Sequence, residues 1–147
     1  MKSSSLIMLF LSIIMLSSCG KTEDYLGSTE YKLYEVNNSG VSGTAIFKEN
    51  KDGSTTIVLQ LDGSSTDVHP GYIYFNSLAE NGSVALTLEP IDCDCESSET
   101  VVTKLDNGTA FSYANFVAFN GNIKIHQNIN DLETVIAQGN IGHNVSK

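Results

Sequence analysis

The 147-residue chain carries 17 acidic side chains against 8 basic ones, and its formal net charge at pH 7 is −9. All 8 basic residues are lysines, so arginine is absent. This balance argues against nucleic acid and anionic lipid surfaces as partners, because both attract cationic proteins. The length is that of one folded domain.

Residues 1–18 have the pattern of a secretory signal. Lys2 provides the positive start, and residues 6–16 form an apolar run with one serine, too short for a membrane span of about 20 apolar residues. The ending, Leu-Ser-Ser-Cys at residues 16–19, resembles the lipobox of bacterial lipoproteins. That resemblance implies cleavage before Cys19 and acylation of its thiol and amine. The alternative is an ordinary signal peptide followed by a chance cysteine.

The polar residues 19–29 are predicted to form a flexible tether. Their start, Gly-Lys-Thr-Glu-Asp at residues 20–24, resembles the short tag that directs Bacteroidetes lipoproteins to the outer face of the outer membrane. A plain solvated tether is the alternative. The expected location is therefore the bacterial outer membrane, on its periplasmic side or at the cell surface. Without residues 1–18 the chain keeps seven lysines and 17 acidic residues, a net charge of −10.

Alternation of apolar and polar residues predicts three strands in the first half of the domain. The first covers residues 31–36 and is expected at a sheet edge. The second and third cover residues 41–48 and 54–61, and the loop between them ends in Asp52-Gly53, a hairpin signal. The third strand has one apolar face with period-two spacing. That face is Ile57, Leu59 and Leu61.

The densest aromatic run is His-Pro-Gly-Tyr-Ile-Tyr-Phe at residues 69–75. Its Pro-Gly pair indicates a turn. The alternation that follows predicts a strand with both tyrosines on one face and the isoleucine and phenylalanine on the other. A turn at Asn81-Gly82 then leads to another strand. The apolar face of that strand is expected to be Val84, Leu86 and Leu88.

The last third of the chain begins with an acidic loop at residues 91–98 and a short predicted strand at residues 100–105. Three phenylalanines near helical spacing predict one helical turn between residues 111 and 119. The stretch 121–126 alternates again, and residues 134–138 form the last predicted strand. The apolar face of 121–126 is Ile123 and Ile125, and its polar face is Asn122, Lys124 and His126.

Short strands between Gly- and Asn-containing turns predict an all-β sandwich or barrel with at most one short helix. The domain is expected to span residues 30–144, with a tail at residues 145–147. The period-two phase of the strands identifies the residues expected in the core. These are Ile57, Leu59, Ile73, Phe75, Leu86, Ile123, Ile125 and Val135.

Five motifs in sequence order resemble the CHRD domain family, in particular its lipid-anchored single-domain members in Bacteroidetes. They are Gly-Thr-Ala-Ile-Phe at 43–47, Asp-Gly at 52–53, His-Pro-Gly-Tyr-Ile-Tyr at 69–74, Ile-Lys-Ile-His at 123–126 and Ala-Gln-Gly-Asn-Ile-Gly at 137–142. The resemblance covers residues 31–144. It implies a Greek-key β-sandwich like that of Cu,Zn superoxide dismutase, and an immunoglobulin-like sandwich is the alternative.

The resemblance assigns positions to the family's histidines. His69 and Pro70 match the start of its His-Pro-Ala-His-Ile-His signature, and His126 matches its late histidine. Tyr72 and Tyr74 stand where the two central histidines would be. A phenol with a pKa of about 10 is a poor metal ligand at neutral pH, so this departure argues against a dismutase. We therefore expect no enzyme activity, no cofactor and no metal.

The candidate ligand-binding residues are His69, Tyr72, Tyr74 and His126. Paired tyrosines can form an aromatic platform for a sugar or a peptide, and the alternative is cross-strand packing. For the two histidines the alternative is a structural hydrogen bond. The expected function is a lipid-anchored envelope or surface domain that binds a protein or glycan without catalysis. The alternative function is a metal-binding or dismutase-derived protein that uses His69 and His126.

The acidic loop holds Cys93 and Cys95, which would be an even pair in an oxidising compartment if Cys19 is acylated. We expect them to form a disulfide with each other, which requires a bend at Asp94. A redox role and pairing between two chains are the alternatives. The neighbouring carboxylates indicate either a solvated loop or a weak calcium site.

Overall fold

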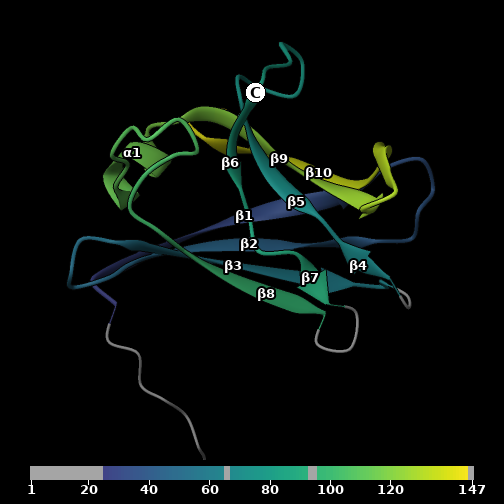
Figure 1. Cartoon of the computed structure of the whole chain (residues 1–147), viewed down its shortest axis with the longest axis horizontal. Helices are drawn as coiled ribbons and strands as arrows, with labels where there is room; N and C mark the ends of the chain where they lie inside the picture. Colours follow the sequence, from purple (N-terminus) through teal and green to yellow (C-terminus); the bar gives the residue numbers. More distant parts are fainter. Residues whose placement is uncertain (1–24, 65–66, 93–95, 146–147) are drawn as a thin grey trace, which may run out of the picture.

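The computed structural model describes residues 25–64, 67–92 and 96–145. Ten antiparallel strands form one continuous sheet that curls into two facing layers, and one short helix lies at one end (Figure 1). This confirms the prediction of an all-β sandwich or barrel with at most one short helix. The lipobox with Cys19 and the pair Cys93 and Cys95 lie outside the described residues, so both stay predictions.

The strand order across the sheet is β4-β7-β8-β3-β2-β1-β10-β9-β5-β6. The elements are β1 (Gly27–Glu35), β2 (Ser42–Glu49), β3 (Thr55–Asp62), β4 (Val68–His69), β5 (Gly71–Phe75), β6 (Val84–Thr87), β7 (Ile91–Asp92), β8 (Ser97–Val102), α1 (Tyr113–Val117), β9 (Asn120–Asn128) and β10 (Asp131–Gly142). In Figure 1, β2, β3 and β8 belong to the lower layer, and β5, β9 and β10 to the upper one. Among the described residues no helix is long and apolar enough to span a membrane.

β1 lies in the middle of the sheet and joins the two layers, whereas the sequence predicted an edge strand. Its residues 27–33 pair with β2, and its last two residues pair with β10. Where β1 crosses β10, a Cβ atom on Gly139 would lie 2.1 Å from the Lys32 carbonyl oxygen, so the close approach requires glycine. β1 also begins at Gly27, three residues before the expected start of the domain.

The core between the layers contains most of the residues that the period-two pattern identified. Those found buried are Ile57, Leu59, Ile73, Leu86, Ile123 and Ile125. The helix α1 closes one end of this core, because the ring of Phe116 packs 5.1 Å from that of Phe47 on β2. Ser112 caps the helix by accepting a hydrogen bond from the Asn115 backbone, and the predicted helical turn is confirmed.

The predicted apolar face of the strand before Pro90 is wrong at Val84. The pairing of β5 with β6 shifts between Ile73 and Tyr74, and Val84 lies opposite Tyr74. A β-bulge of this kind adds one residue and reverses the phase of the strand. Val84 is therefore 41% exposed, and Ala85 is buried instead.

Val135 is not a core residue, although the sequence placed it there. The pairing of β10 with β9 also shifts, and Val135 lies opposite His126 on the outer face. The next residue, Ile136, is buried in its place. Phe75, also predicted in the core, is only half-buried and packs against its edge, with its ring 5.6 Å from that of Phe119.

We expect Leu59→Ala to lower the free energy of unfolding by about 2–5 kcal/mol, because truncation of this buried side chain leaves a cavity. Val101→Ala is the control, since Val101 is 62% exposed, and it should change that free energy by less than about 0.5 kcal/mol. Denaturant unfolding followed by circular dichroism measures both. Equal losses in the two variants would contradict the inward phase of β3.

Candidate functional site

The outer face of β5 and β9 carries three of the four predicted site residues. The register places Tyr72 opposite Lys124 and Tyr74 opposite Asn122. The backbone N–H of His126 donates to the Pro70 carbonyl at 2.9 Å, which continues the same pairing. Since residues two apart share a face of a strand, the two tyrosines and His126 lie side by side on the outer face. The buried isoleucines of both strands point to the inner face.

Tyr72, Tyr74 and His126 form what we call the aromatic cluster. The ring of Tyr72 lies 5.5 Å from His126 and 6.3 Å from Tyr74, measured between ring centroids. The Tyr74 hydroxyl shares a hydrogen bond of 3.0 Å with His126 Nε2. The Lys124 ammonium lies 5.1 Å from the centre of the Tyr74 ring, within the range of a cation–π contact.

Two groups of the aromatic cluster, His126 and Tyr74, favour their neutral forms. Burial lowers the pKa of His126 most strongly, a hydrogen bond with the Leu132 backbone partly opposes it, and the charge of Lys124 adds a smaller lowering that Asp131 opposes. Burial and the neighbouring Tyr72 raise the pKa of the Tyr74 hydroxyl. At neutral pH the cluster therefore presents an uncharged imidazole and an uncharged phenol, which can stack and hydrogen-bond. His126 itself is buried, so a ligand meets the half-exposed tyrosines first.

His69 does not belong to this cluster. It lies on β4, one residue before Pro70, and is buried. Its Nδ1 is 2.7 Å from the Gln127 carbonyl oxygen of β9, so the imidazole links β4 to β9 across the seam between the two layers. No ring contact or hydrogen bond joins it to His126 within the described residues. The predicted polar ligand patch therefore contains only one imidazole.

A metal site is not assembled in the part of the chain that the structure describes. No three side chains of the His, Cys, Asp or Glu type come together in residues 25–64, 67–92 and 96–145. His143, near the end of the described chain, is bonded through Nδ1 to the Ala118 carbonyl oxygen at 3.1 Å. Residues 93–95 of the predicted acidic loop lie outside the described residues, so the calcium and disulfide predictions stay open.

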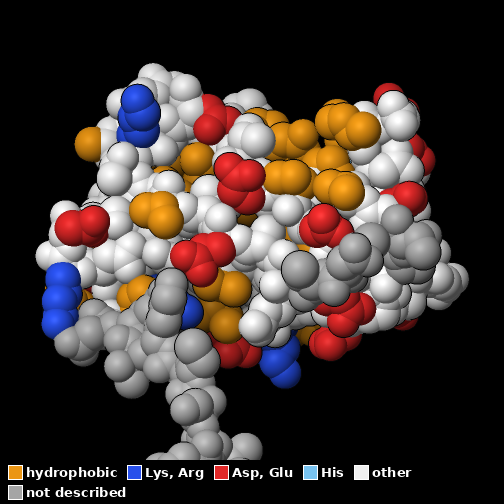
Figure 2. Space-filling view, turned by 60° about the horizontal axis from the view of Figure 1, so that its bottom comes forward, with side chains coloured by type: hydrophobic (Ala, Val, Ile, Leu, Met, Phe, Trp, Pro, Cys, Tyr) orange, Lys and Arg blue, Asp and Glu red, His pale blue; other side chains and the backbone are white. Residues whose placement is uncertain are grey.

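An apolar groove adjoins the aromatic cluster and shares Tyr72 with it. Its volume is 350 Å³, and it is lined by Val68, Pro70, Tyr72, Thr87, Leu88, Pro90 and Ile129. Ile129 is 68% exposed and Val68 is 48% exposed. Figure 2 shows hydrophobic side chains gathered at the upper right of the visible face, with carboxylates around them.

Sequence reasoning missed the apolar groove because its walls come from three separate segments of the chain, 68–72, 87–90 and Ile129. One signal was present: Ile129 is an isoleucine within the asparagine-rich turn 128–130, where a polar residue is expected. An apolar side chain at a turn tip points to a contact surface. The sequence alone does not show which other residues stand beside it.

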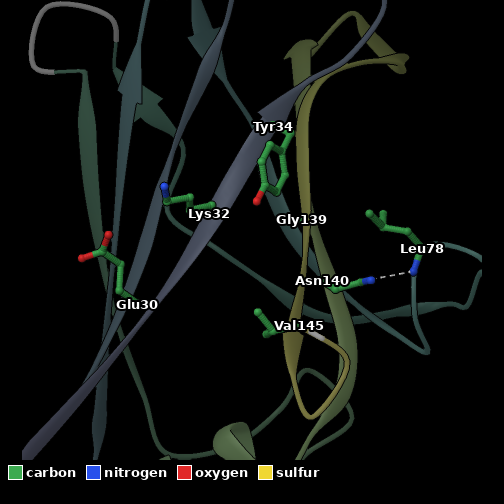
Figure 3. A pocket seen from close by; sticks show the side chains of 7 residues that line it. All are labelled: Glu30, Lys32, Tyr34, Leu78, Gly139, Asn140 and Val145. Atoms are coloured by element: carbon green, nitrogen blue, oxygen red, sulfur yellow. Dashed lines mark hydrogen bonds between the residues drawn. The ribbon is translucent and has the colours of Figure 1, made fainter. Parts of the chain in front are cut away.

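A second, more polar hollow of 470 Å³ lies where β1 crosses β10 (Figure 3). It is lined by Glu30, Lys32, Tyr34, Leu78, Gly139, Asn140 and Val145. Tyr34 is 65% exposed. The Leu78 N–H donates to the Asn140 side-chain oxygen at 2.9 Å, which orients the amide. In Figure 3 Glu30 and Lys32 lie to the left of Tyr34, Asn140 and Leu78 lie to its right, and Val145 lies below it.

No protein-family model matches the chain, and no curated protein matches it either. The CHRD resemblance, drawn from five short motifs, therefore stays a prediction.

We expect the free energy of unfolding to fall as the pH is lowered below about 6.5, the ordinary histidine pKa. Because the pKa of His126 is lowered in the folded protein, the unfolded chain binds a proton at a pH where the folded protein does not, and acid favours unfolding. The stability that the neutral His126 ring contributes is fully present above the histidine pKa of the unfolded chain. It is lost as the pH falls below that pKa.

Denaturant unfolding at about pH 7.5 and about pH 5 measures this dependence. His126→Gln should reduce the difference between the two pH values, and His143→Gln, at an exposed position, should leave it unchanged. An unaltered pH dependence in His126→Gln would contradict the assignment to His126.

Proposed function

We propose that the mature protein is a lipid-anchored domain of the cell envelope that binds a partner through the aromatic cluster and the apolar groove, without catalysis. The observation that carries this proposal is the packing of Tyr72 and Tyr74, both half-exposed, next to an apolar groove. Tyrosine side chains combine a large apolar ring with a hydroxyl, and they are enriched where proteins bind partners.

The proposal leaves out catalysis because the cluster offers no group suited to it. Its imidazole is buried with a lowered pKa, and the Tyr74 phenol has a raised one. A general acid or base works best when its pKa lies near the working pH. The alternative of a metal protein needs His69 and His126 together, whereas His69 Nδ1 bonds to the Gln127 carbonyl of β9 and His126 Nε2 bonds to the Tyr74 hydroxyl of β5.

The anchor is part of the proposal because the lipobox ends at Cys19. Eight residues lead from Cys19 to Gly27, where β1 begins. At about 3.3–3.6 Å per residue, the domain would start within about 30 Å of the acylated cysteine. A partner would therefore be met close to the membrane surface. We place the anchor in the bacterial outer membrane, on the strength of the tag-like residues 20–24.

A glycan is the second candidate ligand, and the polar hollow at the β1 crossing favours it. An exposed tyrosine, Tyr34, can stack on the apolar face of a sugar ring. The amide of Asn140 is oriented by its bond with Leu78, and its NH₂ group remains as a donor for a hydroxyl. The volume lies within the range of about 300–1,000 Å³ that is usual for ligand sites.

For the anchor, we expect Cys19→Ser to abolish incorporation of a labelled fatty acid into the protein, because the acylated thiol is missing. Cys93→Ser is the control and should be labelled like the natural chain. Metabolic labelling followed by immunoprecipitation measures both. Undiminished labelling of Cys19→Ser would show that the lipoprotein assignment is wrong.

For the binding face, we expect a displayed random peptide library, panned against the mature lipidated protein, to yield peptides that bind through the tyrosines. The double variant Tyr72→Ala, Tyr74→Ala should lose these peptides, whereas Val101→Ser, on exposed β8, should keep them. Thermal unfolding verifies that each variant is folded.

A glycan array tests the second candidate ligand with the same protein, and Tyr34→Ala should abolish any binding at the polar hollow. The proposed binding function is wrong if neither the library nor the array gives a ligand that depends on Tyr34, Tyr72 or Tyr74.

A further inference from the structure

The apolar groove is an unusual surface for a protein with so high a net charge. Six of its seven lining residues are apolar or aromatic, and two of them, Val68 and Ile129, project from separate segments at 48% and 68% exposure. Contiguous apolar surface in contact with water is unfavourable, and it marks sites where a partner binds. The groove, with 350 Å³, is near the lower limit of about 300 Å³ for ligand sites, a size suited to one or two bulky side chains.

The sheet edge beside the groove is closed to a partner strand. Both the N–H and the hydroxyl of Thr87 on β6 donate to the Asp106 carboxylate, at 2.9 and 2.8 Å. The Ala85 carbonyl accepts from the Asp106 N–H at 3.0 Å. Edge strands bind other chains through free backbone groups, and these groups are occupied. At the β6 edge a partner at the groove therefore binds through its side chains.

Carboxylates flank the lining residues along the chain. Asp67 precedes Val68, Glu89 stands between Leu88 and Pro90, and Asp131 follows Ile129 by two residues. Hydrogen bonds from Thr134 lower the pKa of the Asp131 carboxyl, so it is ionised at neutral pH. None of these three carboxylates is paired with a lysine in the described part of the chain. A cationic partner would neutralise them, whereas a second copy of this acidic chain would be repelled.

We propose that the apolar groove binds a cationic peptide segment that inserts one phenylalanine or leucine side chain between Val68 and Ile129. Lysine or arginine residues on both sides of that side chain lie beside Asp67, Glu89 and Asp131. Tyr72 forms the wall toward the aromatic cluster. This inference rests on the proposed binding function and names the chemistry of the partner.

The test uses the mature lipidated protein in nanodiscs of zwitterionic lipid, with empty nanodiscs as the blank. Fluorescence anisotropy measures binding of labelled Lys-Lys-Phe-Lys-Lys, compared with Lys-Lys-Ser-Lys-Lys and Glu-Glu-Phe-Glu-Glu. We expect the first peptide to bind at least about tenfold more tightly than the other two. Its affinity should fall when the salt concentration is raised from about 0.05 to about 0.5 M, because salt screens surface charges.

Matched variants locate the binding. Ile129→Ser and Val68→Ser should each weaken the binding of the first peptide several-fold, whereas Val101→Ser, at a similarly exposed valine of β8, should not. Glu89→Gln should weaken it and reduce the salt dependence, and Glu35→Gln on β1 is the charge control. All five positions are exposed, so the variants should fold, which thermal unfolding checks.

The outcomes separate this inference from the proposed function. Equal affinity for the three peptides, or binding that ignores Ile129→Ser and Val68→Ser, overturns the inference. Displacement of the peptide by a fatty acid at low concentration would show an acyl-chain site and would also overturn it. If the peptide library still yields ligands that depend on Tyr72 and Tyr74, the binding function stands and only the cationic partner is wrong.

Discussion

The crossover at residues 69–71 is the constraint on which the candidate site depends. Within three residues the chain leaves β4 in one layer and enters β5 in the other. Gly71 passes through the core, where a Cβ atom would lie 3.1 Å from a methyl carbon of Leu59. The Pro70 carbonyl accepts a backbone hydrogen bond from the His126 N–H at 2.9 Å, and the His69 ring bonds to the Gln127 carbonyl of β9 at 2.7 Å. These two bonds fix β5 against β9. They thereby set the face to which each side chain of β5 points.

The same crossover separates groups that a metal centre would need together. The Nδ1 atom of His69 bonds to the Gln127 carbonyl at the seam, and its Nε2 is buried without a hydrogen-bond partner, while Tyr72 and Tyr74 lie on the outer face with His126. The result is a cluster whose imidazole is held neutral by burial, which lowers its pKa, and whose Tyr74 hydroxyl has a raised pKa and stays protonated. Such a surface favours stacking and hydrogen bonding over proton transfer. The apolar groove continues this surface past Tyr72. The carboxylates of Asp67, Glu89 and Asp131, close to the groove residues in the chain, would favour a cationic ligand.

The outer face of the upper layer is itself partly covered, which decides what a ligand can reach. Asn122 is fully buried there, and its NH₂ group donates to the Asn76 carbonyl at 2.8 Å. His126 is buried beneath its tyrosine neighbours and the β9–β10 hairpin. The sequence alternation predicts that this face is polar, yet two of its side chains, Asn122 and His126, are buried. The tyrosines and the groove remain accessible.

The sequence by itself determined the local features of this protein. Period-two alternation predicted the inward phase of Ile57, Leu59 and Ile73, and Asp52-Gly53 predicted a hairpin, because side-chain direction and turn geometry follow from a few neighbouring residues. Tertiary structure alone decided the rest. The bulges at Val84 and Val135 and the central place of β1 depend on which strands pair and in what register. The burial of His126 and the walls of the groove depend on segments far apart in the chain, and no local pattern encodes which of those segments meet.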